Sequence, residues 1–382
     1  MENTEISIIG GGLIGLTVAW TLAKNNIKVT VFEKDTCGAG ASSYSLGVLG
    51  YPSPLRKTNF HKAHRISLKM TENFYKEIES ESKIPLDYAR IGSLEIIPGE
   101  AQYKQALAEV EYTQSTECDS DTPRLEIIPK DELEKLEPNI KLTEFGAIYA
   151  KAFARLSVDK TIKSIKQACI INGVTIKENT PVKELIVENN KAIGIKLLNG
   201  EKVYSQNILI ASGAWSGSYG KEAAYYAYME GIRGQAIEVK SETRLASHII
   251  KYNKGYIIPS LDDTYGIGST TEKNVGFDSS ATVQGFIDIL TRAKETLPII
   301  SNAKINRHWA GLRPAGRDRK PHIGKVPTID GLFIATGHYK IGFGYAPITC
   351  DIIKRQMLGE EIPYPIDELI PRNAEPLNKK NK

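Results

Sequence analysis

The start of the chain alternates short apolar runs with a stretch of helical periodicity. Glu5–Ile9 is a short apolar run, which is typical of a parallel strand buried on both faces. Apolar side chains then recur at helical spacing from Leu13 to Ala23, and a second apolar run begins at Val29 and closes at Glu33. This strand–helix–strand order predicts the first unit of a Rossmann-like α/β domain.

The same reading along the chain predicts further helices and strands. Segments with apolar residues at helical spacing predict helices at Leu55–Lys83, Glu100–Glu111, Lys130–Leu136, Ser157–Asn172 and Ala346–Leu358. Apolar or alternating runs predict strands at Ile91–Pro98, Gly173–Lys177, Pro181–Val187, Leu332–Ala335 and in the run NILI before the turn Ala211–Gly213. Ala192–Asn199 and Lys202–Tyr204 predict a hairpin, because Asn199-Gly200 between them is a strong turn dipeptide.

A second domain is expected from the alternating stretches Ile232–Lys240, Gly255–Pro259 and Thr264–Ser269. Alternation of this kind predicts antiparallel strands with one buried face. Because these stretches fall between segments of the first domain, the two domains must interleave. The predicted fold class is therefore α/β, with a Rossmann-like domain interleaved with an α+β domain built on an antiparallel sheet.

The three glycines Gly10, Gly12 and Gly15 have the G-x-G-x-x-G spacing between the first strand and the first helix. The first glycine permits a tight turn, the second lets the backbone approach a pyrophosphate, and the third lets helix and strand pack closely. A carboxylate at Glu33, where the second strand ends, can accept hydrogen bonds from ribose hydroxyls. Together these features predict a dinucleotide whose pyrophosphate lies at a helix N-terminus.

Composition and charge narrow the classes of function. The chain has 382 residues, is 41% hydrophobic and carries a formal net charge of +4, which supplies no chain-wide field for polyanions. Its four cysteines are far apart, so neither a zinc site nor a disulfide framework is indicated, and a reducing, cytoplasmic location is expected. No G-x-S-x-G or Cys–His pattern supports a hydrolase.

Two stretches of sequence resemble a membrane span and a metal site, but neither interpretation is favoured. Ile6–Ala23 is uncharged and long enough to cross a bilayer if tilted, but its flank MENTE is acidic and three glycines interrupt it, so no membrane span is expected. His61 and His64 lie on one face of the helix predicted from Leu55, but no third ligand is near. We therefore expect a solvated helix face there and no metal site.

The small-residue stretch Gly38–Leu49, GAGASSYSLGVL, suits a segment that runs along an extended cofactor. Here the chain resembles the D-amino-acid oxidase superfamily of flavoproteins, in which a motif similar to Gly40–Ser43 contacts the phosphates and ribitol of FAD. The resemblance implies a glutathione-reductase-like FAD-binding domain made of residues 1–88, 146–226 and 306–370. Residues 89–145 and 227–305 would form the substrate-binding domain, and 371–382 a frayed tail.

The stretch Arg307–Lys325, RHWAGLRPAGRDRKPHIGK, holds four arginines, two lysines and two histidines against one acid. It could be a nucleic-acid patch, a solvated loop, or a site where one arginine faces a small carboxylate. WAGLRP (Trp309–Pro314) and ATGHYKIGFGYAP (Ala335–Pro347) resemble the glycine oxidase branch of the superfamily. In that branch the arginine of GLRP, here Arg313, binds the substrate carboxylate; the alternative is a structural arginine that bonds backbone carbonyls.

The resemblance also implies roles for other residues. Tyr256 would bind the same carboxylate, while Arg317, Arg319 and Lys320 are expected to be solvated. The catalytic residues would be Arg313, Tyr256 and Lys340, and the substrate-binding residues Arg313, Tyr256, Leu49 and Thr271. Noncovalent FAD would contact Gly10, Gly12, Leu13, Ile14, Gly15, Glu33, Lys34, Ala41, Ser42, Ser43, Gly47, Leu49, Val182, Ser212, Gly213, Trp215, Arg313, His338, Lys340, Ile341, Gly342 and Phe343.

The chain departs from its relatives at Lys340, where many carry arginine, and at Tyr44, Leu46 and Thr271. These changes leave the reaction class alone but put the identity of the substrate side chain in doubt. The start of the helix after Lys340 would stabilise charge on the N1–C2=O edge of the flavin. His338 lies in the same motif, and we expect it to shape the turn rather than to act as a base.

The resemblance implies oxidation of glycine or another small amino or imino acid by hydride transfer from the α-carbon to flavin N5. The products would be an imine or keto acid, ammonia and H2O2, with molecular oxygen or another compound as electron acceptor. One alternative is a D-amino-acid dehydrogenase that reduces a quinone, although such relatives are usually longer. Another is a tRNA-modifying flavoprotein, which usually lacks the WAGLRP form, so no nucleic acid is expected as a partner. A homo-oligomer is possible.

Overall fold

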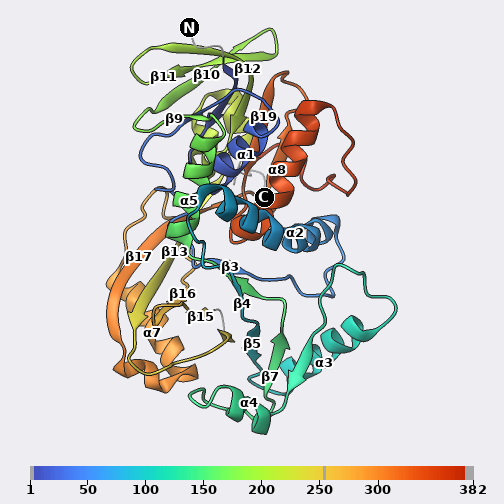
Figure 1. The fold of residues 1–382 in the computed structure, drawn as a ribbon, viewed down its shortest axis with the longest axis vertical. Helices are drawn as coiled ribbons and strands as arrows, with labels where there is room; N and C mark the ends of the chain where they lie inside the picture. Colours follow the sequence, from blue (N-terminus) through green and yellow to red (C-terminus); the bar gives the residue numbers. More distant parts are fainter. Residues whose placement is uncertain (1–3, 253–254, 375–382) are drawn as a thin grey trace, which may run out of the picture.

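The computed structural model describes residues 4–252 and 255–374. Its framework is two eight-stranded sheets and one three-stranded sheet. Figure 1 shows the two large sheets one above the other along the longest axis of the molecule, with the helices of the first sheet at the top. In the described part of the chain, no helix is long and apolar enough to cross a membrane.

The first sheet is mainly parallel. Its strands are β1 (Thr4–Ile9), β2 (Val29–Phe32), β9 (Thr175–Lys177), β10 (Val182–Glu188), β11 (Lys191–Leu197), β12 (Lys202–Ile210), β18 (His322–Lys325) and β19 (Leu332–Thr336). The order is β10-β11-β12-β1-β2-β9, with β19 beside β12 and β18 beside β19. β1 is parallel to β2 and β12, and β19 is parallel to β12. The carboxyl ends of these four strands therefore meet at one edge, where sheets of this type bind ligands.

The second sheet is mainly antiparallel and has the order β17-β13-β16-β15-β14-β5-β7-β6. Its strands are β5 (Ser93–Ile96), β6 (Glu126–Ile128), β7 (Ala147–Ala150), β13 (Glu230–Lys240), β14 (Ile249–Tyr252), β15 (Gly255–Pro259), β16 (Thr264–Gly268) and β17 (Lys304–Ala315). The long pair β13–β17 runs from Glu230 opposite Ala315 to Lys240 opposite Lys304. The small sheet joins β3 (Val48–Leu49), β8 (Ala154–Arg155) and β4 (Ala89–Arg90).

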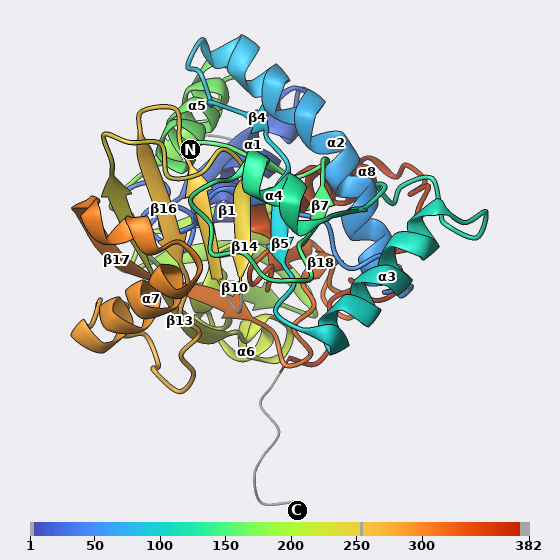
Figure 2. The same ribbon diagram turned by 90° about the horizontal axis from the view of Figure 1, so that it is seen from below.

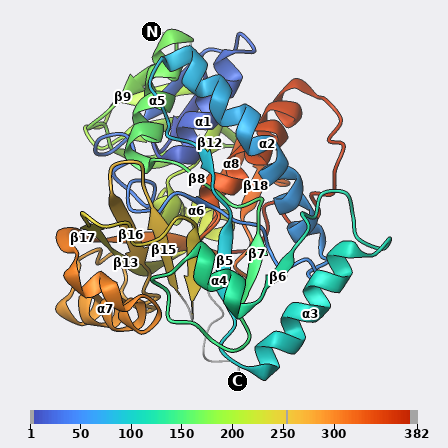
Figure 3. The same ribbon diagram turned by 60° about the horizontal axis from the view of Figure 1, so that its bottom comes forward.

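The helices form two groups. They are α1 (Leu13–Ala23), α2 (Asn59–Ser82), α3 (Glu100–Gln114), α4 (Lys130–Leu136), α5 (Val158–Ile171), α6 (Lys221–Ala227), α7 (Val283–Thr296) and α8 (Gly342–Leu358), with 3-10 turns η1 (Gly213–Ser218) and η2 (Pro298–Asn302). α1, α2, α5 and α8 pack together in one core, in which Leu16, Tyr75, Ile165 and Ile348 have no exposed surface. Figures 1 and 2 both show α2 lying beside α8. α7 packs on the second sheet, as Figure 3 shows, through Ile289 and Ala293.

The α/β class with a Rossmann-like domain and an antiparallel second sheet is confirmed. The domain division stays a prediction. Strands β7 and β17 both belong to the second sheet, where β7 lies between β5 and β6 and β17 lies beside β13. Most of their residues fall within the ranges 146–226 and 306–370 predicted for the FAD-binding domain. The sequence pattern did not predict α6, α7 or β14. Strand β12 continues from Lys202 to Ile210, whereas the hairpin strand was predicted to end at Tyr204. The predicted tail lies largely outside the described residues.

The predicted start of α8 at Ala346 was wrong, because the helix begins at Gly342 and continues through Pro347. Proline has no N–H, so the carbonyl of Phe343 loses its helical partner. The hydroxyl of Tyr75 in α2 donates to that carbonyl instead, at 2.7 Å. A distant side chain therefore replaces the missing bond and permits one more helical turn.

The predicted start of α2 at Leu55 was also wrong, because the helix begins at Asn59. The N–H of Phe60 in its first turn donates to Glu368 Oε2 at 2.6 Å. The prediction of a solvated face was wrong for His64, which is 4% exposed and whose ring centroid lies 5.3 Å from that of Tyr345. Burial lowers the pKa of His64 to about 3.

Candidate active site

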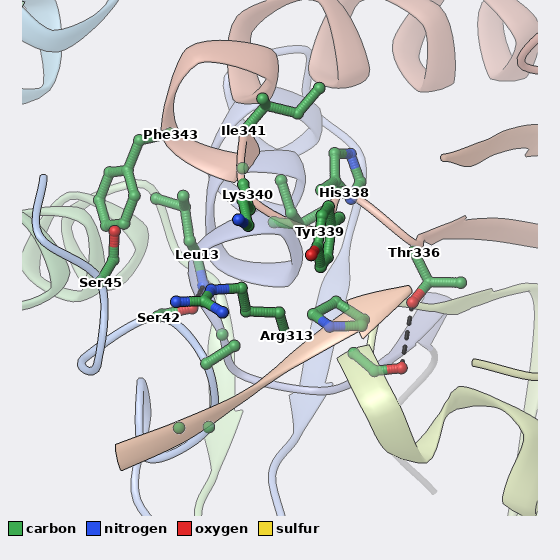
Figure 4. Close-up of a pocket in the computed structure, with 18 of the residues that line it drawn as sticks. Leu13, Ser42, Ser45, Arg313, Thr336, His338, Tyr339, Lys340, Ile341 and Phe343 are labelled. Atoms are coloured by element: carbon green, nitrogen blue, oxygen red, sulfur yellow. Dashed lines mark hydrogen bonds between the residues drawn. The ribbon is translucent and has the colours of Figure 1, made fainter. Parts of the chain in front are cut away.

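A cavity of about 860 Å³ lies where the carboxyl edge of the first sheet faces the second sheet. Its lining comes from the ends of β1, β2 and β12, the first turns of α1 and α8, and the strands β13, β15 and β17. This volume is in the upper part of the roughly 300–1,000 Å³ range of ligand sites. In Figure 4, the side chains of Arg313, Tyr339 and Lys340 come together in this cavity.

The glycine motif forms a close-packed cradle at one end of the cavity. Gly10 has a φ of +111°, and a Cβ there would lie 2.7 Å from the carbonyl oxygen of Ala211. A Cβ at Gly15 would lie 1.9 Å from the carbonyl oxygen of Gly10, so only glycine permits this contact between helix and strand. The N–H of Leu13 donates to Ser42 Oγ at 2.9 Å, which fixes the small-residue segment beside the start of α1.

Glu33 lies at the end of β2, where the motif requires an acid. Its Oε2 accepts from the N–H of Gly11 at 2.7 Å, and its Oε1 accepts from the N–H of Asp35 at 2.9 Å. These two bonds orient the carboxylate, which also lines the cavity. Each oxygen keeps a lone pair for a further donor, such as a ribose hydroxyl.

Aromatic and apolar side chains form the outer rim of this end. Lys34 Nζ lies 3.8 Å from the ring centroid of Trp215, and that ring stacks on Phe277 with centroids 5.6 Å apart. Pro181 and Val182 line the same cavity. Pro181, Val182 and Trp215 therefore give this end an apolar lining of the kind that suits an adenine ring.

Arg313 lies in β17 at the opposite end of the cavity. Its Nη1 donates to the carbonyl oxygen of Thr270 at 3.0 Å, and its Nη2 donates to Ser269 Oγ at 2.8 Å. Burial lowers the pKa of Arg313, although the group stays a cation at working pH. Within the described residues no carboxylate lies within 4.0 Å of it, so its remaining donors face the cavity without an anion.

Lys340 lies on the loop before α8 and points toward Arg313 (Figure 4). Its Nζ donates to Thr271 Oγ1 at 3.3 Å. Burial, together with the charges of Arg313 and Arg319, lowers the pKa of Lys340 to about 8. The ring of Tyr339 is close to two of these cations, with Lys340 Nζ 5.3 Å and Arg319 Cζ 5.8 Å from its centroid.

His338 is buried beside this loop and is held by a chain of two hydrogen bonds. Its Nε2 lies 3.0 Å from Thr349 Oγ1, and that hydroxyl donates to the carbonyl oxygen of Tyr345 at 2.8 Å. Since the hydroxyl proton is already used, the Nε2 of His338 must carry the proton and donate. Burial lowers the pKa of His338 to about 3, so the ring is neutral.

The segment that contains Tyr44 and Leu46 packs against the second sheet at two glycines, Gly311 and Gly268. The carbonyl of Tyr44 accepts from Trp309 Nε1 at 3.2 Å, and a Cβ at Gly311 would lie 2.5 Å from Tyr44 Cβ. Leu46 packs over Gly268 in the same way, 3.0 Å from its ideal Cβ. Both residues line the cavity, so the departures seen in the sequence narrow it from one side.

The structure brings most of the expected site residues to this one cavity. Those that line it are Gly10, Gly12, Leu13, Ile14, Glu33, Lys34, Ala41, Ser42, Val182, Ser212, Gly213, Trp215, Tyr256, Arg313, His338, Lys340, Ile341, Gly342 and Phe343. Gly15, Ser43, Gly47, Leu49 and Thr271 are not part of its lining. Leu49 is 2% exposed and packs in the core, while its neighbours Val48 and Gly50 line the cavity.

Sequence reasoning missed several contributors. Gly234 in β13 provides the surface under Arg313, and Ser269 bonds to the guanidinium. Tyr339 lies near Lys340 and Arg319, and Arg319 is exposed, as expected, but also lines the cavity. The GHYK motif marks Tyr339 and the cationic run marks Arg319, whereas no sequence signal points to Gly234 or Ser269.

The basic side chains of Arg307–Lys325 have different partners and do not form one continuous basic surface. Arg313 points into the cavity, while Lys320 forms an ion pair with Glu368. Arg307 lies 3.7 Å from Asp159 and stacks on Trp309, with its Cζ 4.2 Å from the ring centroid. These separate partners favour the interpretation in which one arginine faces a small anion.

Comparison with known proteins identifies the family. The family model for FAD dependent oxidoreductases, DAO, matches residues 5–356. The glycine oxidase of Bacillus subtilis (strain 168) is 26% identical over 362 residues, which are 94% of this chain and 95% of that protein. The crystal structure of glycine oxidase from Geobacillus kaustophilus matches with a TM-score of 0.90 at 23% identity, covering 97% of this chain and 98% of that one. Glycine oxidase from Bacillus cereus ATCC 14579 matches with a TM-score of 0.86 at 26% identity, covering 94% and 98%.

The chain therefore belongs to the DAO family of FAD-dependent oxidoreductases. It is an enzyme of the amino-acid oxidase class that uses FAD, as its sequence predicted. The cavity fits this cofactor, because the glycine cradle leaves room for a pyrophosphate and Glu33 lies where a ribose would bind. None of the four cysteines lines the cavity, which agrees with noncovalent binding.

Proposed function

We propose that the protein oxidises an amino or imino acid of the glycine type, with molecular oxygen as acceptor and H2O2 as product. The observation that carries this proposal is Arg313, a half-buried guanidinium that faces the cavity without a carboxylate partner among the described residues. A planar guanidinium can hold a carboxylate through two parallel hydrogen bonds and so fix its orientation. The similarity to glycine oxidases supports an amino-acid substrate.

The site residues would divide the work between binding and charge stabilisation. Arg313 binds the substrate carboxylate, and Tyr256, which lines the same cavity from β15, adds a hydroxyl donor. The start of α8, from Gly342 onward, presents free N–H groups that favour negative charge on a bound ring. Bound FAD supplies the hydride acceptor.

The proposed reaction needs no side-chain base. The amine reacts in its neutral form, the α-C–H bond breaks with its electron pair, and the nitrogen lone pair forms the C=N bond. Water then converts the imine to a keto acid and ammonia, and oxygen takes two electrons and two protons to become H2O2. Arg313 and Tyr256 therefore act by orientation. His338 would hold the turn, because its Nε2–H is already bonded to Thr349.

The test is a substrate panel read by two signals. Purified protein is mixed with glycine, sarcosine, D-alanine and D-proline, and both flavin bleaching without oxygen and H2O2 release with oxygen are recorded. The proposal expects both signals with at least one of these compounds. Flavin bleaching without H2O2, followed by rapid turnover with an added quinone, would favour the dehydrogenase alternative instead. Absence of bleaching with every amino and imino acid would refute the proposal.

A further inference from the structure

The charged lining of the substrate end is entirely basic in the described residues. The charged residues that line the cavity away from the dinucleotide cradle are Arg56, Lys251, Arg313, Arg319 and Lys340. The one acidic lining residue is Glu33, which lies at the cradle and is bonded to the N–H groups of Gly11 and Asp35. A site for a single carboxylate needs one cation, so the number of basic groups here calls for an explanation.

Two of the basic groups have a local explanation. Lys251 forms an ion pair with Glu95, and the side chain of Arg56 is exposed to solvent. No carboxylate of the described chain lies within 4.0 Å of Arg313, Lys340 or Arg319. Arg313 is half-buried, whereas Lys340 and Arg319 are exposed like Arg56 but lie close to Tyr339. Lys340 Nζ and Arg319 Cζ lie 5.3 Å and 5.8 Å from the ring centroid of Tyr339, and Figure 4 shows Lys340 pointing toward Arg313.

The arrangement of Arg313 and Lys340 is unfavourable without an anion. Like charges repel each other, and the low pKa of Lys340 reflects partial desolvation together with the charges of Arg313 and Arg319. Lys340 is solvent-exposed, but its Nζ donates to Thr271 Oγ1 at 3.3 Å, which keeps the ammonium beside the cavity. Arg313 is fixed independently by Thr270 and Ser269. The fold therefore holds two separate cations toward one space.

We propose that the substrate carries a second carboxylate: Arg313 binds the α-carboxylate, and Lys340, with Arg319 nearer the mouth, binds the other. The substrate class is a dicarboxylic amino or imino acid. One carboxylate can satisfy the planar fork of Arg313 with both oxygens, which leaves the ammonium of Lys340 for another anion. This inference rests on the proposed oxidase function and specifies its substrate.

Matched substrates separate this inference from a single shared carboxylate. Iminodiacetate differs from sarcosine by a carboxylate in place of a hydrogen on the N-methyl group, and D-aspartate differs from D-asparagine by one charge at nearly the same shape. Wild-type protein is expected to favour the dicarboxylate of at least one pair by roughly tenfold to a hundredfold in kcat/KM, the range of one charge-assisted hydrogen bond. If both dicarboxylates are poorer than their partners, the inference is refuted.

Variants assign the preference to Lys340. In Lys340→Met the kcat/KM ratio within the favoured pair should fall to about one, whereas Lys340→Arg should keep most of the preference. Lys325→Met is the matched control, because Lys325 lies in β18, pairs with Asp330 and does not line the cavity. Its ratio should equal that of wild type. An equal loss for both members of the pair in Lys340→Met would mean that Lys340 and Arg313 share one carboxylate, and would overturn the inference.

A second variant and the flavin absorbance distinguish failure of this inference from an unstable variant or from failure of the proposed oxidase function. Arg319→Gln changes a second exposed cation of the cavity lining, whose guanidinium also lies near Tyr339, and should reduce the ratio by a smaller factor. Flavin absorbance reports whether each variant still holds FAD. If no amino or imino acid reduces the flavin, the proposed function fails. If sarcosine and D-asparagine each reduce it at least as well as their dicarboxylate partners, only the present inference fails.

Discussion

The guanidinium of Arg313 lies directly over the α-carbon of Gly234, in the neighbouring strand. A Cβ at position 234 would come within 1.9 Å of Nη2 and 2.1 Å of Cζ of Arg313. The two residues are brought together by the β13–β17 pairing, in which Gly234 lies opposite Gly311. The position of the proposed carboxylate anchor therefore depends on the absence of a side chain one strand away.

Gly234→Ala should accordingly displace the guanidinium while leaving the dinucleotide cradle intact. We expect a fall in kcat/KM of at least tenfold, mostly through KM, with flavin content near that of wild type. Steady-state kinetics and flavin absorbance measure the two effects. Gly99→Ala is the control, because a Cβ there would meet its nearest atom at 3.5 Å. Normal kinetics in a folded Gly234→Ala protein would contradict the placement of the anchor.

Removing the anchor itself gives the upper limit of this effect. Arg313→Ala should lower kcat/KM by an amount equivalent to about 2–5 kcal/mol, the cost of truncating one partner of a buried charge pair. FAD should stay bound. Tyr256→Phe should lower kcat/KM less, because it removes one neutral donor. Unchanged kinetics in a flavin-loaded Arg313→Ala variant would refute the assigned role.

Gly12 provides a graded test of the cofactor cradle. Within the described residues a Cβ at this position would meet only Ser42 Oγ at 3.2 Å, so Gly12→Ala should fold normally but hold its flavin more weakly, because the methyl group lies where the backbone approaches the pyrophosphate. Gly12→Leu should lose it, because a longer side chain fills the space left for the pyrophosphate. The ratio of flavin to protein absorbance decides between the two, and a fully yellow Gly12→Leu protein would argue against this site.

His338 tests whether the reaction requires a base. His338→Gln keeps a side-chain donor for Thr349, and we expect flavin reduction within about tenfold of wild type in stopped flow. A primary isotope effect with α-deuterated substrate should remain. Loss of several orders of magnitude with FAD still bound would place His338 in the chemistry, since a general base contributes typically 10²–10⁴-fold.

The low pKa of Lys340 predicts a pH dependence for anion binding. Its folded pKa of about 8 lies below the ordinary value of 10.5, so the ammonium is present below pH 8 and is lost as the pH rises through it. The Kd of malonate, an unreactive dicarboxylate that stays fully ionised in this range, should therefore rise by up to about tenfold per pH unit above pH 8. In Lys340→Met this rise should disappear. A flat profile in wild type would contradict the exposure of Lys340 to the ligand.

By itself the sequence determined the local parts of this protein. The strand, glycine turn, helix and acid from Glu5 to Glu33 follow one another within a few turns of chain, so spacing alone predicts their arrangement. The resemblance of WAGLRP and GHYK identified Arg313 and Lys340, and both line the cavity. The spacing of apolar residues shows which face of a helix or strand is buried, but it does not show which other segment covers that face.

Only the tertiary structure decided which distant residues meet. Gly234 contacts Arg313 because β13 pairs with β17, and no pattern within either strand specifies that partner. Helix α8 passes through Pro347 because Tyr75, far away in sequence, bonds the carbonyl that proline leaves free. Charge convergence has the same origin: Arg313 and Lys340 come from a strand and a loop that the fold turns toward one space. Side-chain packing between segments, rather than periodicity along them, fixed these relationships.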